Sequence, residues 1–170
     1  MIFGVLADTQ GPLTISQLAA LRKAFKGVDC ILHAGPVGDL RVIDQLQKLA
    51  PTKAVCGNAE DPIVRSELPV RTAWKVGPVS MGLIHGYGKP QGLKKWLLHQ
   101  FEEDPVQVVV YGRNFEPIAR SLGGHFFFNP GSFCGNLPEG QHGKRGPGLV
   151  GLLFIHGKKV DGQPGIPILP

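Results

Sequence analysis

Six short polar segments of this chain follow apolar runs, and each contains or adjoins a glycine. They are ADTQG (7–11), HAGPVGD (33–39), GNAED (57–61), IHGYG (84–88), YGRNF (111–115) and NPGSF (129–133). Ligands of an open α/β sheet bind beyond the carboxyl ends of its strands, so six such turns predict one site at one edge. One of these turns carries Arg113, a side chain that cannot bind a metal and rarely acts as a base. An arginine where such a site would begin therefore needs a physical explanation.

The elements that must position these turns are predicted from apolar runs and helical periodicity. Buried strands are predicted at 2–7, 29–34, 52–57 and 105–112, and helices at 14–26, 39–49 and 90–101. Hairpins are predicted at 72–86 across Gly77-Pro78, at 116–128 around Gly123-Gly124, and at 149–161 around His156-Gly157. The first three strands form two βαβ units, which require parallel pairing. The predicted fold class is α/β, a β-sandwich of mixed parallel and antiparallel sheets flanked by helices, with residues 1–170 as a single domain.

The apolar spacing also predicts which helix faces are buried. Ile15, Leu18, Leu21 and Phe25 share a face of the first helix, and Leu40, Ile43, Leu46 and Leu49 share a face of the second. Thr14 is the predicted N-cap of the first helix. Gly and Pro crowd residues 130–148, which predicts a long surface loop, and the tail PGIPILP predicts extended chain.

Composition excludes several classes of protein. The net charge is +5 and charged residues make up 18% of the chain, but aromatic residues do not alternate with Lys and Arg as single-strand nucleic-acid binding requires. We therefore do not expect nucleic acid as a partner. No apolar stretch approaches the ~20 residues of a membrane span, and Asp8 interrupts the first apolar run. We expect a cytoplasmic protein with no membrane partner. Three scattered cysteines, Cys30, Cys56 and Cys134, predict neither a disulfide framework nor a zinc knuckle.

The order and spacing of the six turns resemble those of the calcineurin-like metallophosphoesterases, specifically the small bacterial and archaeal phosphodiesterases and the retromer subunit that shares their fold. Members carry D-x-H, G-D, G-N-x-D, H-G-H, G-H-T-H and N-P-G-S in this order, and the likeness extends to about residue 160. The resemblance implies an α/β sandwich that cleaves phosphoester bonds. It also implies two divalent metals that clamp a phosphate and activate water.

The motifs depart from the family pattern at most of the implied metal ligands. Asp8, Asn58 and His85 are kept, and the resemblance makes them residual ligand positions for a divalent cation. The other motif positions hold Gln10, Pro36, Glu60, Tyr87, Arg113 and Phe115. Proline has no donor atom where the family has the Asp that bridges both metals. We therefore expect no cofactor, or at most Mn, Zn or Mg at low occupancy.

Arg113 is predicted to replace the lost metal charge. Without cations, Asp8 would lie in a partly buried pocket, with Glu60 facing it if that side chain points inward, and unpaired carboxylates there are costly. A guanidinium at the position of a lost histidine could pair with either carboxylate through its planar fork. The alternative is that Arg113 points from the turn into solvent.

The remaining polar residues of the motifs have simpler interpretations. His33 lies in a buried strand and is predicted to be a hydrogen-bonded structural histidine. Asp39 is predicted to begin the second helix rather than to replace the missing bridging Asp. Glu60 and Asp61 suit a turn, although either could reach inward, and Tyr87 is predicted to support a loop. Asn129 is predicted to form an Asx turn over Pro130-Gly131.

Two function classes follow from these residues. The first is a pseudoenzyme, a binding or scaffold member with a degenerate metal site whose partner is a protein, or a phosphorylated small molecule or anion. The second is a weak or single-metal phosphodiesterase, with His85 and Arg113 as its catalytic residues and Arg113 stabilising the transferred phosphoryl charge. The first is favoured because Asn and one His hold a divalent ion weakly.

Overall fold

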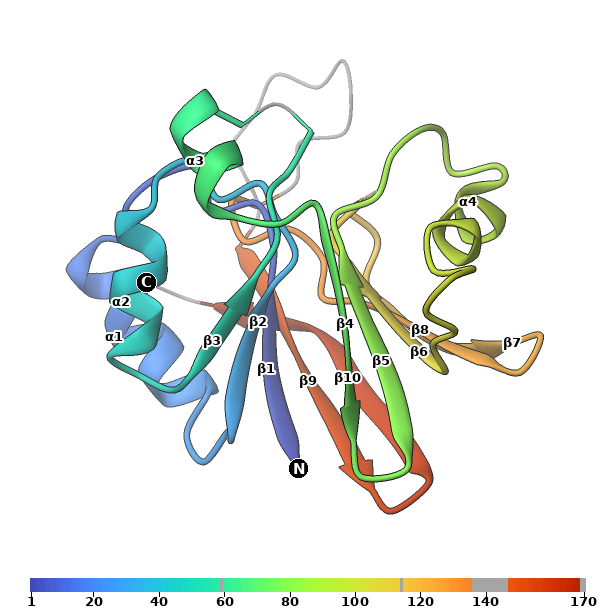
Figure 1. Ribbon diagram of the computed structural model, residues 1–170. Helices are drawn as coiled ribbons and strands as arrows, with labels where there is room; N and C mark the ends of the chain where they lie inside the picture. Colours follow the sequence, from blue (N-terminus) through green and yellow to red (C-terminus); the bar gives the residue numbers. More distant parts are fainter. Residues whose placement is uncertain (59, 114, 136–146, 169–170) are drawn as a thin grey trace.

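The computed structural model describes residues 1–58, 60–113, 115–135 and 147–168. Two five-stranded sheets lie face to face, with helices on their outer surfaces (Figure 1). One sheet has the order β10-β9-β1-β2-β3 and the other has the order β4-β5-β6-β8-β7. The predicted α/β sandwich of mixed sheets is confirmed.

The first sheet contains the two predicted βαβ units. β1 (Ile2–Leu6), β2 (Cys30–His33) and β3 (Thr52–Ala54) pair in parallel and alternate with α1 (Ile15–Ala24) and α2 (Arg41–Gln47). β9 (Gly148–His156) joins β1 antiparallel, and β10 (Lys159–Ile168) pairs with β9 along its length. The predicted extended tail is therefore the end of β10 as far as Ile168; Leu169 and Pro170 lie outside the described residues.

The second sheet begins and ends with the predicted hairpins. β4 (Arg71–Val76) and β5 (Val79–Ile84) pair antiparallel across Gly77-Pro78, and β7 (Ile118–Leu122) and β8 (His125–Asn129) pair across Gly123-Gly124. β6 (Val108–Tyr111) lies parallel to both β5 and β8. α4 (Leu93–His99) connects β5 to β6 and covers the outer face of this sheet (Figure 1).

Three apolar clusters hold the layers together. The cluster between the sheets includes Phe3, Val5, Met81, Val108 and Phe128. A second packs α1 and α2 on the first sheet, and a third packs α4 on the second sheet. Phe25 lies directly over Gly4, where a Cβ would be 2.8 Å from its ring, so this strand position needs glycine. Each buried Leu or Phe stabilises the fold by about 1.5–3 kcal/mol.

The start of α1 was predicted correctly from its capping residue, whereas the extent of its buried face was not. Thr14 caps α1 in a capping box with Gln17, as its side chain predicted. Ile15 was placed on the buried face, but it is 89% exposed, because the first turn of α1 lies beyond the edge of the core. The third hairpin turns one residue later than predicted, at Gly157-Lys158.

One helix was missed. α3 (Pro62–Glu67) follows Asp61, whose side chain accepts the Ile63 N–H as N-cap, with Pro62 at the first helical position. Both signals stand in the sequence, but a helix of six residues shows no apolar periodicity, so none is predicted for this segment. Residues 136–146 of the predicted loop, including His142, lie outside the described residues.

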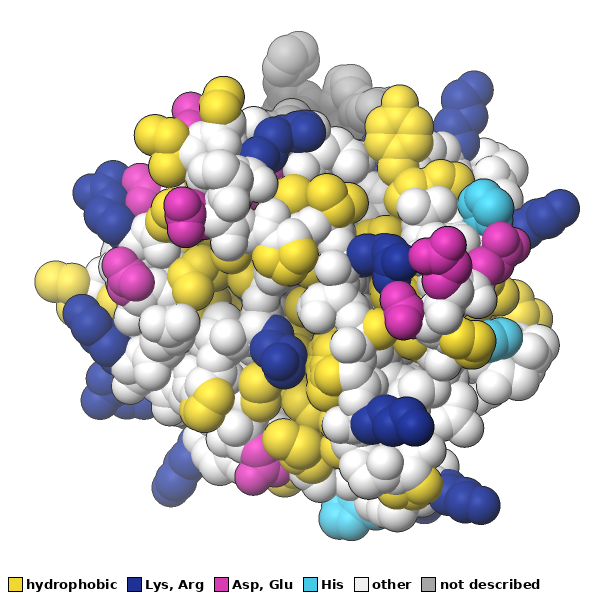
Figure 2. All heavy atoms as spheres, viewed as in Figure 1, with side chains coloured by type: hydrophobic (Ala, Val, Ile, Leu, Met, Phe, Trp, Pro, Cys, Tyr) yellow, Lys and Arg dark blue, Asp and Glu magenta, His cyan; other side chains and the backbone are white. Residues whose placement is uncertain are grey.

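On the face shown in Figure 2, Lys and Arg side chains are spread over the surface with acidic side chains among them. This distribution is typical of solvated helix and turn surfaces. Within the described ranges, no helix is long and apolar enough to cross a membrane.

Candidate functional site

The turns after β1 and β2 are joined by main-chain hydrogen bonds. The N–H groups of Asp8 and Thr9 donate to the carbonyl oxygens of Gly35 (3.0 Å) and Pro36 (3.2 Å). Asp8 and Gln10 adopt left-handed φ values of 62° and 55°, and Phe115, in the turn after β6, adopts 28°. Such values are uncommon outside glycine and cluster at ligand sites. The backbone is therefore strained at three motif positions, two in the turn after β1 and one in the turn after β6.

The turns of the second sheet are tied to those of the first. His85 Nδ1 donates to the Ala34 carbonyl oxygen at 2.9 Å, and Asn58 Nδ2 donates to the Gly86 carbonyl oxygen at 3.0 Å. Gly112 lies against the same turn, where a Cβ would be 2.5 Å from the Ala34 oxygen. The strand ends that carry the polar segments therefore converge at one edge of the sandwich, as the sequence predicted.

Asp8 lies at this edge and is buried, with only 6% of the residue exposed. Burial raises the pKa of Asp8 to about 6, although a hydrogen bond with Ser132 and the charge of Arg113 lower it in part. Ionisation of Asp8 is therefore penalised in the folded chain.

His85 is buried beside the same edge. Burial lowers the pKa of His85 despite its hydrogen bond with Ala34, and the nearby Arg113 cation lowers it further. Since Nδ1 donates to a carbonyl oxygen, the neutral ring carries its lone pair on Nε2. That lone pair is the group that His85 can offer to a ligand.

Arg113 lies in the turn after β6, against the turn after β5, but does not make the predicted pair. Its side chain is half-buried, its Cβ lies 3.0 Å from a Cβ built at Gly86, and its charge acts on both Asp8 and His85. Among the described residues, however, its guanidinium makes no hydrogen bond or ion pair with Asp8 or Glu60, and Nε is buried with no acceptor. The predicted contact of Arg113 with Asp8 or Glu60 is therefore wrong, and the Glu60 carboxylate has other partners.

Those partners are three main-chain N–H groups. Glu60 is 8% exposed, and Oε1 accepts from Val37 and, at 3.1 Å, from Gly57, while Oε2 accepts from Gly38 at 2.9 Å. The carboxylate thus fastens the turn after β2 to the turn after β3. Sequence reasoning allowed Glu60 to point inward but missed this role. The available signal was a pair of glycine-rich turns whose buried N–H groups need acceptors.

The substituted motif residues offer little to a metal. Asn58 is exposed; its Nδ2 donates to the Gly86 carbonyl oxygen and its main-chain carbonyl oxygen accepts from Arg65, so Oδ1 is the atom that it could offer. Pro36 packs on Gly57, where a Cβ would lie 2.7 Å from Pro36 Cγ. The ranges that the structure describes contain no group of three or more His, Cys, Asp or Glu side chains that could hold a metal ion.

Other polar residues take the structural roles predicted for them. His33 is fully buried, accepts from the Gly35 N–H through Nδ1 (3.0 Å) and lies 2.9 Å from Thr9 Oγ1 through Nε2. Burial lowers its pKa to about 3. Asp39 binds the main-chain and side-chain nitrogens of Arg41 at the start of α2. Tyr87 is exposed, and its ring lies 6.3 Å from that of Trp96.

The NPGS segment forms the predicted Asx turn. Asn129 Oδ1 accepts the Gly131 N–H at 3.1 Å, and its Nδ2 donates to the Arg113 carbonyl oxygen at 2.5 Å. The turn brings buried Ser132 to the Asp8 carboxyl group. Asn129 therefore positions both Arg113 and the hydrogen-bond partner of Asp8.

We expect Asp8→Asn to stabilise the chain at pH 7.5. The folded pKa of about 6 exceeds the ordinary 3.8, so stability from this group is present below pH 3.8 and is lost as pH rises through 6. Asparagine removes that loss and tolerates a φ of 62°. Urea unfolding measures the free energy of unfolding of both proteins. The advantage of Asp8→Asn over the wild type should grow by about 1–3 kcal/mol from pH 4 to 7.

Two buried histidines, His33 and His85, make stability depend on pH in the opposite direction, but this effect cancels when Asp8→Asn is compared with the wild type. The lowered pKa values of His33 and His85 give stability that is lost as pH falls, and both proteins contain them. An Asp8→Asn variant that is less stable at pH 7.5, with a difference that does not change with pH, would contradict the account of Asp8.

Comparisons with known proteins agree with this geometry. Residues 1–145 match the model of the calcineurin-like phosphoesterase superfamily domain. A probable metallophosphoesterase of Methanothermobacter thermautotrophicus is 33% identical over 164 residues, covering 96% of this chain and 91% of the relative. A second, from Methanocaldococcus jannaschii, is 32% identical over 136 residues, covering 78% of this chain and 68% of the relative.

Solved structures share the fold at lower identity. An archaeal phosphodiesterase superposes with a TM-score of 0.73 at 20% identity, covering 95% of this chain and 98% of its own. Vps29 from Chaetomium thermophilum gives a TM-score of 0.73 at 18% identity, covering 92% and 86% of the two chains. At these identities the likeness shows the fold alone.

Proposed function

Because the chain belongs to the calcineurin-like phosphoesterase superfamily, we propose that it is a member whose own side chains replace the metal pair, and that it binds a ligand without hydrolysing it. The observation that carries this proposal is the Glu60 carboxylate. Glu60 stands where the family motif has Asp, and its carboxylate oxygens accept hydrogen bonds from three main-chain N–H groups. A metal at this edge could therefore not draw on the Glu60 carboxylate without breaking those hydrogen bonds.

The donor set that remains does not fit two divalent ions. Asp8 already has a raised pKa, Asn58 is exposed, and Pro36 supplies no bridging oxygen. The Arg113 cation acts on both Asp8 and His85, so a dication placed between them would be repelled. The proposal therefore includes no tightly bound metal.

Arg113 supports an oxyanion as the ligand. Its buried Nε–H has no acceptor among the described residues, and a buried donor without an acceptor costs about 1–3 kcal/mol. A phosphate-type oxygen would satisfy that donor and pair with the guanidinium charge. We infer that a phosphorylated small molecule or another oxyanion binds at Arg113 in a single-domain protein of the cytoplasm.

Binding of inorganic phosphate in the presence of EDTA tests this function. Calorimetry should detect phosphate binding by the wild type, and Arg113→Met should weaken it roughly tenfold or more, the loss of a charge-assisted hydrogen bond. Arg120→Met, on the exposed part of β7, is the matched control and should bind as the wild type does. Binding that EDTA abolishes, or that Arg113→Met leaves unchanged, would contradict the proposal.

A single-metal phosphodiesterase is the second candidate. It is favoured by one observation, the Nε2 lone pair of His85 beside Asp8 and Arg113. This candidate predicts turnover of a chromogenic phosphodiester with added manganese that His85→Ala abolishes. The candidate that binds a ligand without hydrolysing it predicts negligible turnover for both the wild type and His85→Ala.

A further inference from the structure

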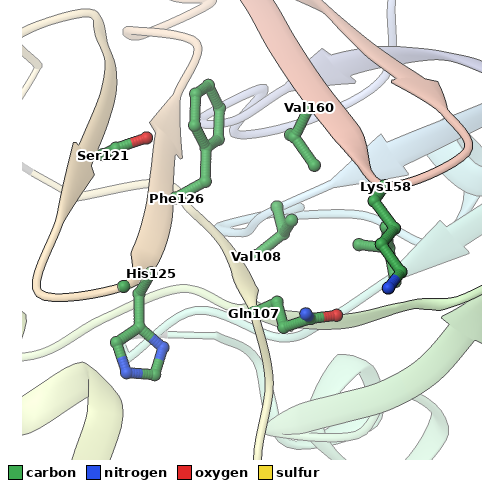
Figure 3. A pocket seen from close by; sticks show the side chains of 9 residues that line it. Gln107, Val108, Ser121, His125, Phe126, Lys158 and Val160 are labelled. Atoms are coloured by element: carbon green, nitrogen blue, oxygen red, sulfur yellow. The ribbon is translucent and has the colours of Figure 1, made fainter.

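A cavity lies at the end of the sandwich opposite to the candidate site. It has a volume of about 250 Å³, and its walls come from both sheets (Figure 3). Val79 and Val108 begin β5 and β6, whereas His85 and Arg113 follow the ends of these strands. A strand of six residues spans about 20 Å, so the cavity is separate from the phosphate-type site.

Four apolar side chains from four different strands line the inner part of the cavity. They are Val79, Val108, Phe126 and Val160, and they either belong to the apolar cluster between the sheets or pack against it. Figure 3 shows Phe126 and Val160 on either side of the space, with Val108 between them. Val79 and Val108 are almost fully buried, so the apolar surface that a ligand can reach comes from the partly buried Phe126 and Val160.

The rim of the cavity carries hydrogen-bond donors and a positive charge. Gln107 Oε1 accepts from the Ser80 N–H at 3.0 Å, which holds the amide in place, and Gln107 Nε2 donates to no described residue. Lys158 extends toward the Gln107 amide in Figure 3, and Ser121 lies across the opening. His125 is anchored by Nδ1, which donates to the Val106 carbonyl oxygen at 2.8 Å.

No acidic residue lines the cavity to balance this charge. Within the described part of the chain, Lys158 forms no ion pair, and the residues around the space include neither Asp nor Glu. An ammonium group and an amide donor at the rim of an apolar space favour a ligand with an anionic head and a hydrocarbon tail. Pockets for drug-sized ligands measure about 300–1,000 Å³, so this smaller space suits a ligand of about ten non-hydrogen atoms.

We propose that this cavity binds a small aliphatic carboxylate, with the carboxylate at Lys158 and Gln107 and the hydrocarbon chain against the partly buried Phe126 and Val160. The proposal is independent of the function assigned to Arg113. Charge complementarity at the rim sets the preference for an anion, and apolar contact with Phe126 and Val160 adds to the affinity.

Titration of the full chain with octanoate, followed by backbone amide NMR, tests the proposal. Saturable shifts are expected at Ser121, Gly124 and Lys158, and octan-1-ol and octylamine should bind several-fold more weakly. Lys158→Met should weaken octanoate binding about fivefold, because an exposed ion pair contributes up to about 1 kcal/mol. Lys159→Met, the neighbouring exposed lysine that does not line the cavity, should bind as the wild type does.

Ser121→Trp provides a second variant that leaves the interior intact. Ser121 is exposed at the opening, so a tryptophan there would fill the space and should abolish the octanoate shifts. Equal binding of octanoate and octylamine, shifts confined to other regions, or octanoate binding that survives Ser121→Trp would each overturn the proposal.

Discussion

Replacement of Glu60 by alanine is expected to lower the free energy of unfolding by about 3–5 kcal/mol. The carboxylate accepts from the N–H groups of Val37, Gly38 and Gly57, and it is 8% exposed. Each buried donor left without an acceptor costs about 1–3 kcal/mol, and partial access of water to the vacated space reduces the sum. Against a typical stability of about 5–15 kcal/mol, this loss is large.

Glu60→Gln separates the hydrogen bonds from the bulk of the side chain. The amide keeps one acceptor oxygen but turns an NH₂ group toward a main-chain donor, so we expect a loss of about 2–3 kcal/mol. Glu67→Ala, on the exposed face of α3, should change stability by less than about 0.5 kcal/mol. Urea unfolding of the wild type and of these three variants measures the changes in the free energy of unfolding. A Glu60→Ala protein within 1 kcal/mol of the wild type would show that the two turns do not depend on this carboxylate.

The second large effect is expected from rebuilding the family ligands. A variant with Gln10→His, Pro36→Asp, Arg113→His and Phe115→His should bind manganese at least about a hundredfold more tightly than the wild type, about 3 kcal/mol. The changes supply a bridging carboxylate and three imidazoles and remove the repelling guanidinium. Histidine tolerates left-handed φ values better than most residues, so the backbone at Gln10 and Phe115 suits it.

Arg113→His alone is the matched control. It removes the cation but leaves Pro36, which still withholds the bridging oxygen, so calorimetry should detect no tight manganese binding by this variant. Tight binding by Arg113→His would mean that the arginine, rather than the proline, keeps metal away. Weak binding by the fourfold variant would mean that the backbone no longer has the geometry of a metal site.

The sequence predicted the sandwich because its signals are local and repeated. Apolar runs marked the strands, Gly77-Pro78 and Gly123-Gly124 marked two hairpins, and Thr14 marked the start of α1. The position of Ile15 was wrong because helical periodicity shows which residues share a face, but not how far the core extends beneath it.

The site was predicted in its location but not in its hydrogen bonding. Six polar turns indicated a common edge, and Asp8 and His85 indeed lie there. The choice between Arg113 and three main-chain N–H groups as the partner of Glu60 depends on how two turns approach each other, which no spacing in the sequence encodes. That no described residue supplies an acceptor for Arg113 Nε likewise depends on three-dimensional packing.

The claim that side chains replace the metal pair is tested most directly by titrating the purified wild-type chain with manganese in a calorimeter. The same preparation is assayed with a chromogenic phosphodiester before and after treatment with EDTA. The account predicts no stoichiometric manganese binding, negligible turnover and no change in stability with EDTA. Two tightly bound manganese ions per chain, with turnover that EDTA abolishes, would contradict it.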